Sequence, residues 1–110
     1  MKPEKVVQIF NALGHESRLE IFKTLIHSGR KGLSVNELAN LIGLKQNTLS
    51  TNLQILLHAQ LVKRSRQGRY ICYQADMGTL KNLFAYVLED CCGGDAQQCH
   101  SLFSQLDFAC

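Results

Sequence analysis

The chain has 110 residues, of which 45% are hydrophobic and 19% charged, and its formal net charge is +3. This length suffices for one compact domain but is close to the lower limit for stable isolated folds, so we expect a partner subunit. The sequence contains no run of about 18 apolar residues and no signal-peptide pattern, so it predicts neither a membrane span nor export. We therefore expect a cytoplasmic protein.

Positive charge is concentrated in the middle of the chain. Between residues 38 and 75 every charged side chain is basic, whereas residues 76–110 carry five acids against Lys81 alone. A basic run can be merely a solvated surface, but it also suits contact with phosphates. The middle of the chain is thus the candidate region for nucleic-acid binding.

Apolar residues at helical spacing predict three helices in the first part of the chain. The first ends near Gly14, and the second begins with a capping-box pattern at Ser17–Glu20 (SRLE). The third is short and ends at Gly43, the residue type favoured just past a helix terminus. Their apolar positions are Val6, Ile9, Phe10 and Leu13; Leu19, Phe22, Leu25 and Ile26; and Val35, Leu38, Ala39 and Ile42.

A fourth helix is predicted over residues 46–60, with leucines on one face and amides and hydroxyls on the other. Two helices joined by three or four residues form a helix-turn-helix, whose second helix lies in the major groove. A plain solvated helix is the alternative, but such helices usually carry Glu or Lys, and residues 46–60 contain neither. We expect the base-contacting residues to be Gln46, Asn47, Thr48, Ser50, Thr51 and Gln54.

A β-hairpin and a last helix complete the predicted fold. Alternation over residues 61–65 and 70–75, with a turn at Gln67 and Gly68, predicts a wing that carries Arg64, Arg66 and Arg69 to phosphates or the minor groove. From Met77 to about Asp90, a broad apolar stripe predicts a helix with a dimerisation face. The fold class is thus mainly α with a β-hairpin wing, in the order four helices, two strands and one helix.

The sequence resembles the ArsR/SmtB family of winged-helix metalloregulators over nearly its whole length. The segments that carry the resemblance are ALGHESRLEIFKTL and LSVNELANLIGLKQNTLSTNLQILLHAQLVKRSRQGRYICYQA. The resemblance implies a homodimer, joined through its N- and C-terminal helices, that occupies operator DNA and leaves it when an inducer binds. Residues 1–92 would form the DNA-binding and dimerisation domain, and residues 93–110 a flexible cysteine-bearing tail. At Lys45, Thr51 and Asn52 the chain departs from residues common in the family, and these differences leave the operator sequence open.

Two inducer sites that the resemblance implies lack their ligands in this chain. A CxC arsenic motif before the recognition helix would fall on Ser34 and Asn36. A zinc site on the last helix would use Asp76 with Gly78, Glu89 and Cys92, and two of these four positions fit poorly.

The segment DCCGGDAQQCH, residues 90–100, is the remaining candidate for an inducer site. LFAYVLEDCCGG resembles the helix end of an arsenite-responsive subgroup of the family. Trivalent arsenic binds three thiolates, and we expect these to come from Cys91, Cys92 and Cys99. Seven residue steps separate Cys92 from Cys99, and because an extended chain of that length spans up to about 25 Å, it has ample slack to close a loop around one ion. Antimonite is an alternative inducer, and a methylated arsenical would need only Cys91 and Cys92.

Other interpretations of the cysteines remain open. Cys91, Cys92, Cys99 and His100 could form a Cys3His zinc site, or the thiols could sense oxidants or persulfide. Cys110 is an auxiliary ligand or a spectator, and Cys72 fits a half-buried position on a wing strand. An enzyme is not expected, because the sequence lacks a CxxC motif, a phosphate-binding loop and a βαβ pattern. A DNA-binding architectural protein without an inducer is the other alternative.

Overall fold

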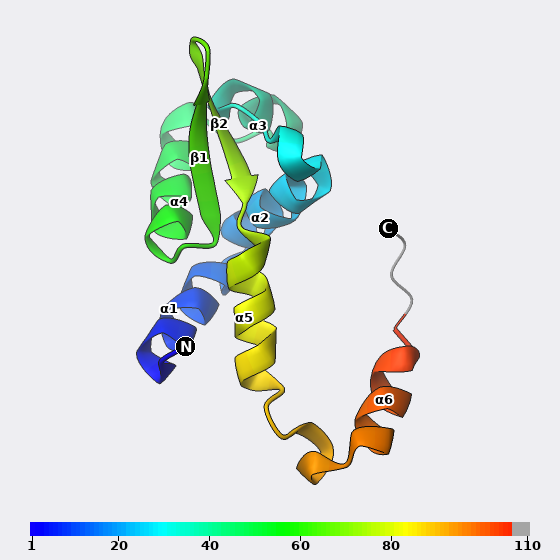
Figure 1. The fold of residues 1–110 in the computed structure, drawn as a ribbon. Helices are drawn as coiled ribbons and strands as arrows, with labels where there is room; N and C mark the ends of the chain where they lie inside the picture. Colours follow the sequence, from blue (N-terminus) through cyan, green and yellow to red (C-terminus); the bar gives the residue numbers. More distant parts are fainter. Residues whose placement is uncertain (107–110) are drawn as a thin grey trace.

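The structure, a computed structural model, describes residues 1–106 apart from the side chain of Cys91. It confirms a mainly helical fold with a β-hairpin wing (Figure 1). In chain order the elements are α1 (Pro3–Leu13), α2 (Glu16–Ser28), the 3₁₀ helix η1 (Gly29–Lys31), α3 (Val35–Ile42), α4 (Gln46–His58), β1 (Val62–Gln67), β2 (Tyr70–Ala75), α5 (Met77–Val87), the 3₁₀ helix η2 (Cys91–Gly94) and α6 (Ala96–Ser104).

The hydrophobic core lies where α1 to α4 meet the hairpin and α5. Side chains from every one of these helices enter it, which explains the helical spacing of the apolar residues in the sequence. The largest fully buried side chains are Ile9, Ile21, Leu25, Leu38, Leu49, Leu53, Leu56, Leu61 and Leu83. This packing fixes the orientation of α4, whose other face is solvent-exposed.

The capping box predicted for the start of the second helix is wrong. The capping box expected at Ser17 is absent, because α2 begins at Glu16 and the amide of Leu19 already donates to the carbonyl of His15 at 2.9 Å. Ser17 is therefore inside the helix. A capping box instead starts α3, where Ser34 and Glu37 bind each other's backbone amides. As predicted, α3 ends at Gly43, whose φ of 81° is in the left-handed region.

Residues 43–45 connect α3 to α4, which gives the predicted helix-turn-helix. The hairpin strands pair antiparallel from Val62 opposite Ala75 to Gln67 opposite Tyr70. Gly68, with a φ of 64°, provides the positive φ that a two-residue hairpin turn needs. The base of the wing is tied to the body by two backbone hydrogen bonds between Leu33 and Tyr73, of 2.8 and 3.0 Å.

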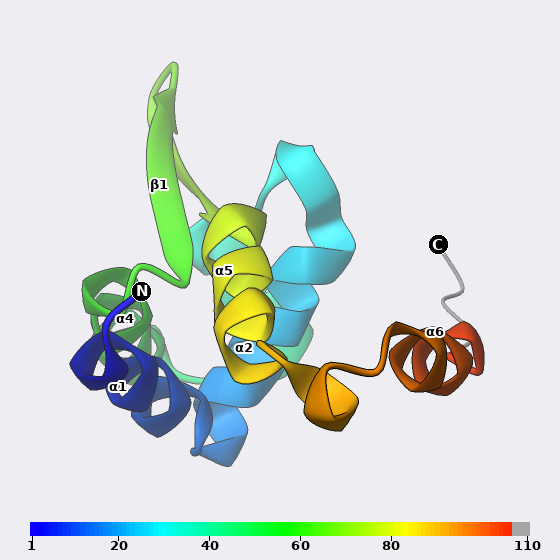
Figure 2. The same ribbon diagram turned by 60° about the horizontal axis from the view of Figure 1, so that its bottom comes forward.

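The C-terminal part differs from the prediction in two respects. Helix α5 ends at Val87 rather than near Asp90. Glu89 and Asp90 come just after the C-cap residue Leu88, and negative charge is unfavourable at the carboxyl end of a helix. Within the segment expected to be a tail, residues 96–104 form α6, which packs against η2 and stands apart from the rest of the fold (Figure 2). Over residues 1–106, no helix has both the length and the apolar character needed to cross a membrane.

Candidate nucleic-acid interface and cysteine segment

Helix α4 presents a polar face to solvent, because its apolar residues are used by the core. Leu49, Leu53 and Leu56 are at most 1% exposed. All six residues expected to contact bases lie on the exposed side of the helix: Gln46, Asn47, Thr48, Ser50, Thr51 and Gln54. Their amide and hydroxyl groups can donate and accept hydrogen bonds, as base edges in a major groove require.

Hydrogen bonds organise the first turns of this face. The side-chain Nε2 of Gln46 donates to Asn36 Oδ1 of α3, which links the two helices of the helix-turn-helix at their polar surface. Asn47 Oδ1 accepts from the backbone amide of Thr48 at 2.8 Å, and Thr51 Oγ1 donates to the carbonyl of Asn47 at 3.0 Å. These hydrogen bonds hold side chains at the amino end of α4 in place.

The wing extends a second set of DNA-binding candidates away from the body (Figure 1). Arg64 and Arg66 lie on β1 opposite Tyr73 and Ile71, and Arg69 lies in the turn. All three arginines are exposed. On β2, Cys72 is only 9% exposed, and its Sγ lies 3.6 Å from Gln67 Oε1. Cys72 is thus part of the wing's packing, as expected.

The buried position of Asn52 was not predicted from the sequence. Asn52 lies on the buried side of α4 and is only 8% exposed. Its Nδ2 donates to the carbonyl of Thr48 at 3.1 Å, and its Oδ1 accepts from Arg18 Nη1 at 3.4 Å. The spacing could have revealed this position, because residue 52 falls three residues after Leu49 and four before Leu56.

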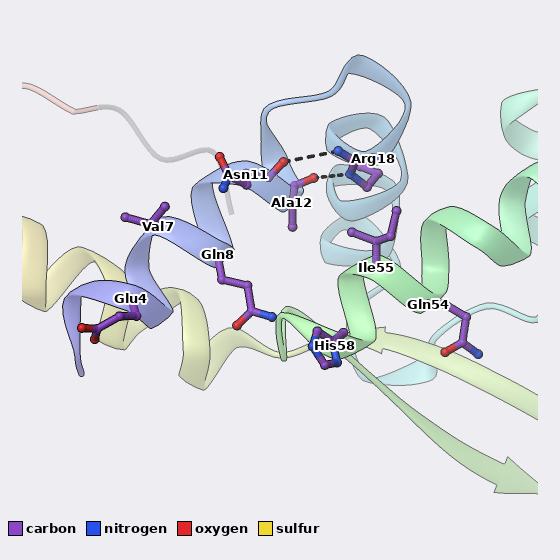
Figure 3. A pocket seen from close by; sticks show the side chains of 9 residues that line it. All are labelled: Glu4, Val7, Gln8, Asn11, Ala12, Arg18, Gln54, Ile55 and His58. Atoms are coloured by element: carbon purple, nitrogen blue, oxygen red, sulfur yellow. Dashed lines mark hydrogen bonds between the residues drawn. The ribbon is translucent and has the colours of Figure 1, made fainter.

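An open groove of about 670 Å³ separates α1 from the second half of α4 (Figure 3). It is lined by apolar and polar side chains, among them Val7, Gln8, Ile55 and His58. Arg18 lies where α1 ends, and its guanidinium donates to the carbonyls of Asn11 and Ala12. The two helices flanking the groove are thus connected through Arg18.

The cysteine segment follows α5 in a left-handed turn. Asp90, Cys92, Gly93 and Gly94 all have positive φ, between 54° and 84°. The amide of Asp95 donates to the carbonyl of Cys92 at 3.2 Å, and the amide of Cys99 donates to the carbonyl of Asp95 at 3.0 Å. These two hydrogen bonds of Asp95 therefore keep the backbone between Cys92 and Cys99 compact.

Placement of the expected arsenic ligands is only partly described. Cys92 and Cys99 are half-buried, on η2 and α6, whereas His100 is exposed. The side chain of Cys91 and the whole of Cys110 lie outside the described residues. Among the side chains that are described, no three of Cys, His, Asp or Glu form a group able to hold a metal. The three-cysteine site therefore stays a prediction.

The histidines of the body are all exposed, as expected for residues without a shared site. His15 precedes α2, while His27 and His58 lie near the ends of α2 and α4. Asp76 caps α5, where its carboxylate accepts from the amide of Thr79 at 3.2 Å. Asp76, the carboxylate at the start of α5 that a zinc site there would use, thus has a structural role.

A helix-turn-helix with an exposed polar second helix, followed by an arginine-bearing hairpin, defines a winged-helix DNA-binding protein. Comparisons with known proteins agree with this class. The family model described as a helix-turn-helix domain matches residues 13–65. An uncharacterized HTH-type transcriptional regulator of Bacillus subtilis, YbzH, is 33% identical, and the match covers 74% of this chain and 93% of that protein.

Similar solved structures indicate the family to which the chain belongs. An ArsR-like transcriptional regulator from Rhodococcus is 26% identical with a TM-score of 0.71, and the match covers 97% of this chain and 96% of that one. The homodimeric winged helix-turn-helix domain of Mb0332 from Mycobacterium bovis, a possible ArsR-family regulator, is 26% identical with a TM-score of 0.64 over 96% and 88% of the two chains. The chain belongs to the ArsR/SmtB family of winged-helix transcriptional regulators. This is a family of DNA-binding regulators, not of enzymes.

Proposed function

We propose that the protein is a homodimeric repressor that leaves its operator when As(III) binds Cys91, Cys92 and Cys99. The observation that carries the DNA-binding part is the exposed, uncharged face of α4 beside the arginines of the wing. Helix α4 would read base edges in the major groove, while Arg64, Arg66 and Arg69 would contact phosphates or the minor groove. The elements that would make the base contacts and the phosphate contacts are both held in orientation by the core.

Exposed apolar side chains on α1 and α5 support the dimer. Phe84 and Val87 on α5 are 54% and 50% exposed, and Val7 and Phe10 on α1 are 57% and 50% exposed. Large exposed apolar residues that recur along a helix favour burial against another surface. A second copy of the chain that buries these four side chains, together named the proposed dimer face, would set the distance between the two recognition helices, which must meet major grooves about 34 Å apart.

The chemistry of the cysteine segment supports a thiophilic inducer. Cys92 and Cys99 belong to consecutive short elements, and the hydrogen bonds at Asp95 keep the chain between them compact. Soft thiolate ligands select soft ions, and trivalent arsenic takes three thiolates in a pyramid. Cys91 would supply the third thiolate. Antimonite shares this chemistry, whereas a monomethyl arsenical would need only two thiols.

The location of the segment suggests how binding would affect DNA affinity. Cys91 and Cys92 lie shortly after the end of α5, so gathering them with Cys99 around one ion would change how the end of α5 packs in the dimer. A coupling of about 1 to 3 kcal/mol between the sites would weaken operator binding by about 5- to 150-fold. A change in the distance between the recognition helices is sufficient for such a loss.

A titration of labelled operator DNA tests the proposal. The operator would first be selected from random duplexes with the reduced protein. Release by arsenite at stoichiometric amounts, with no release by zinc or peroxide, is the expected result. Release by zinc alone would favour the Cys3His site with His100, and release by peroxide or persulfide would favour a redox sensor. Release by none of them would indicate constitutive DNA binding.

A further inference from the structure

Arg18 binds the end of α1 through its guanidinium. Nε donates to the carbonyl of Ala12 at 2.6 Å, and Nη2 donates to the carbonyl of Asn11 at 3.3 Å. Both carbonyls belong to the last turn of α1, where backbone acceptors lack partners within the helix. A positive charge is also favourable at the carboxyl end of a helix dipole. Arg18, on α2, thus closes the carboxyl end of α1 (Figure 3).

The same guanidinium reaches α4. Arg18 Nη1 donates to Asn52 Oδ1 at 3.4 Å, and Asn52 Nδ2 donates to the carbonyl of Thr48 at 3.1 Å. Asn52 therefore uses both ends of its amide within the protein. At 8% exposure, its side chain is largely withdrawn from solvent, on the side of α4 opposite the exposed Ser50 and Gln54. These contacts make it a poor candidate for reading a base.

We infer that Arg18 and Asn52 are positioning residues, which fix the recognition helix relative to α1 and thereby determine operator selectivity. The inference rests on the proposed reading of DNA by α4. Besides its contacts with Arg18, α1 carries Val7 and Phe10 of the proposed dimer face. The chain of contacts therefore runs from the dimer face through the carbonyls of α1 and Arg18 to Asn52 and the backbone of α4.

A small rotation of α4 would have different effects on the two kinds of DNA contact. Base contacts depend on the placement of side chains such as Ser50 and Gln54, whereas phosphate contacts depend mainly on charge. Loosening the link between Arg18 and Asn52 should therefore lower operator affinity and leave affinity for random DNA nearly unchanged. Loss of folded protein would instead lower both affinities by the same factor.

The test uses Asn52→Leu, which keeps the branched outline of the side chain but removes both polar groups, and Arg18→Lys, which keeps the charge but removes the forked geometry. Asn52→Asp retains an acceptor for Arg18, and Arg30→Lys makes the same basic replacement at an exposed position on η1. Affinity for the selected operator and for random duplexes would be measured for each folded variant at one salt concentration. Thermal unfolding would be recorded in parallel.

We expect Asn52→Leu and Arg18→Lys to lose about 5- to 150-fold in the ratio of operator to random affinity, the loss of one good base contact. The double variant should lose no more than the worse single variant, because the two residues act through one link. Asn52→Asp should lose less of this affinity ratio than Asn52→Leu does, and Arg30→Lys should keep the wild-type ratio.

Three outcomes would overturn the inference, and they are distinguishable. If the wild type prefers its operator and both variants keep the same ratio, the link does not position α4, and the proposed function stands. A wild type without any preference would reject reading by α4 and the inference with it. Equal losses of operator and random binding would show a role in folding alone, which also contradicts the inference.

Discussion

Ser34 and Glu37 bind each other's backbone at the start of α3. Ser34 Oγ accepts from the amide of Glu37 at 3.2 Å, and Glu37 Oε1 accepts from the amide of Ser34 at 3.0 Å. Two amides that α3 itself cannot satisfy thus have partners. Ser34→Ala should lower the free energy of unfolding by about 1 kcal/mol, measured by urea denaturation. An unchanged urea midpoint would contradict this role.

The same contacts predict a pH dependence. Hydrogen bonds from the backbone and side chain of Ser34 hold the pKa of Glu37 below its ordinary value. A lowered pKa means that the stabilisation is fully present above the ordinary pKa of a glutamate and is lost as the pH falls through the lowered value. The stability advantage of the wild type over Glu37→Gln should therefore shrink in acid, as urea midpoints over a pH series would show. An advantage independent of pH would exclude the charge as its source.

Gly32 permits the close approach of the wing to the body. Its φ is 70°, and a Cβ at this position would lie 2.6 Å from the carbonyl oxygen of Tyr73. Gly32→Ala should destabilise the fold by about 1 to 3 kcal/mol, because backbone rather than a mobile side chain must move. Gly29→Ala is the matched control, since φ there is also positive, at 64°, but no atom lies within 4 Å of the Cβ. Equal losses in the two variants would show that φ alone, and not the contact, limits this position.

The wing arginines should contribute to DNA affinity through charge. Arg66→Ala or Arg69→Ala should weaken binding and reduce the slope of log K against log salt by about 0.9 for each phosphate that the protein no longer neutralises. Fluorescence anisotropy at several salt concentrations would measure this slope. Lys23→Ala, an exposed change on α2, is the control. If both arginine variants keep the wild-type slope, the wing does not contact phosphate.

Residues at the amino end of α4 should instead determine sequence preference. Gln46→Ala and Ser50→Ala remove groups that can bind base edges, and each missing base contact should cost about 1 to 3 kcal/mol of discrimination. Gln46 also donates to Asn36, so Asn36→Ala separates the effect of that hydrogen bond from the effect of a base contact. Binding to a set of single-base operator variants is the measurement. Identical preferences in both α4 variants would mean that the recognition surface is elsewhere.

The cysteine prediction is tested by single substitutions. Cys91→Ser, Cys92→Ser and Cys99→Ser should each bind the operator but fail to release it with arsenite, because a hydroxyl is a hard ligand that rarely ionises. Cys72→Ala and Cys110→Ser should release it as the wild type does. Cys99→Ser should still respond to a monomethyl arsenical if two thiols suffice for it. Normal release by all three serine variants would rule out this segment as the arsenite site.

Local sequence patterns determined much of the fold. The spacing of Leu49, Leu53 and Leu56 identified both the buried face of α4 and the exposed polar face opposite it, because helical periodicity places such residues on one side. Gly43 and Gly68 marked a helix end and a turn, since both need a positive φ. These features depend on a few neighbouring residues, so the sequence alone carries them.

Tertiary structure decided what depends on distant or competing contacts. Ser17 and Ser34 both begin a capping-box pattern, but only Ser34 lies where the chain turns into a helix. Asn52 is polar, yet its partner Arg18 is 34 residues away in the sequence. Helix periodicity can place Asn52 on the inner face, but it cannot supply the guanidinium that makes this position favourable. That contact exists only because packing of α1, α2 and α4 brings the two side chains together.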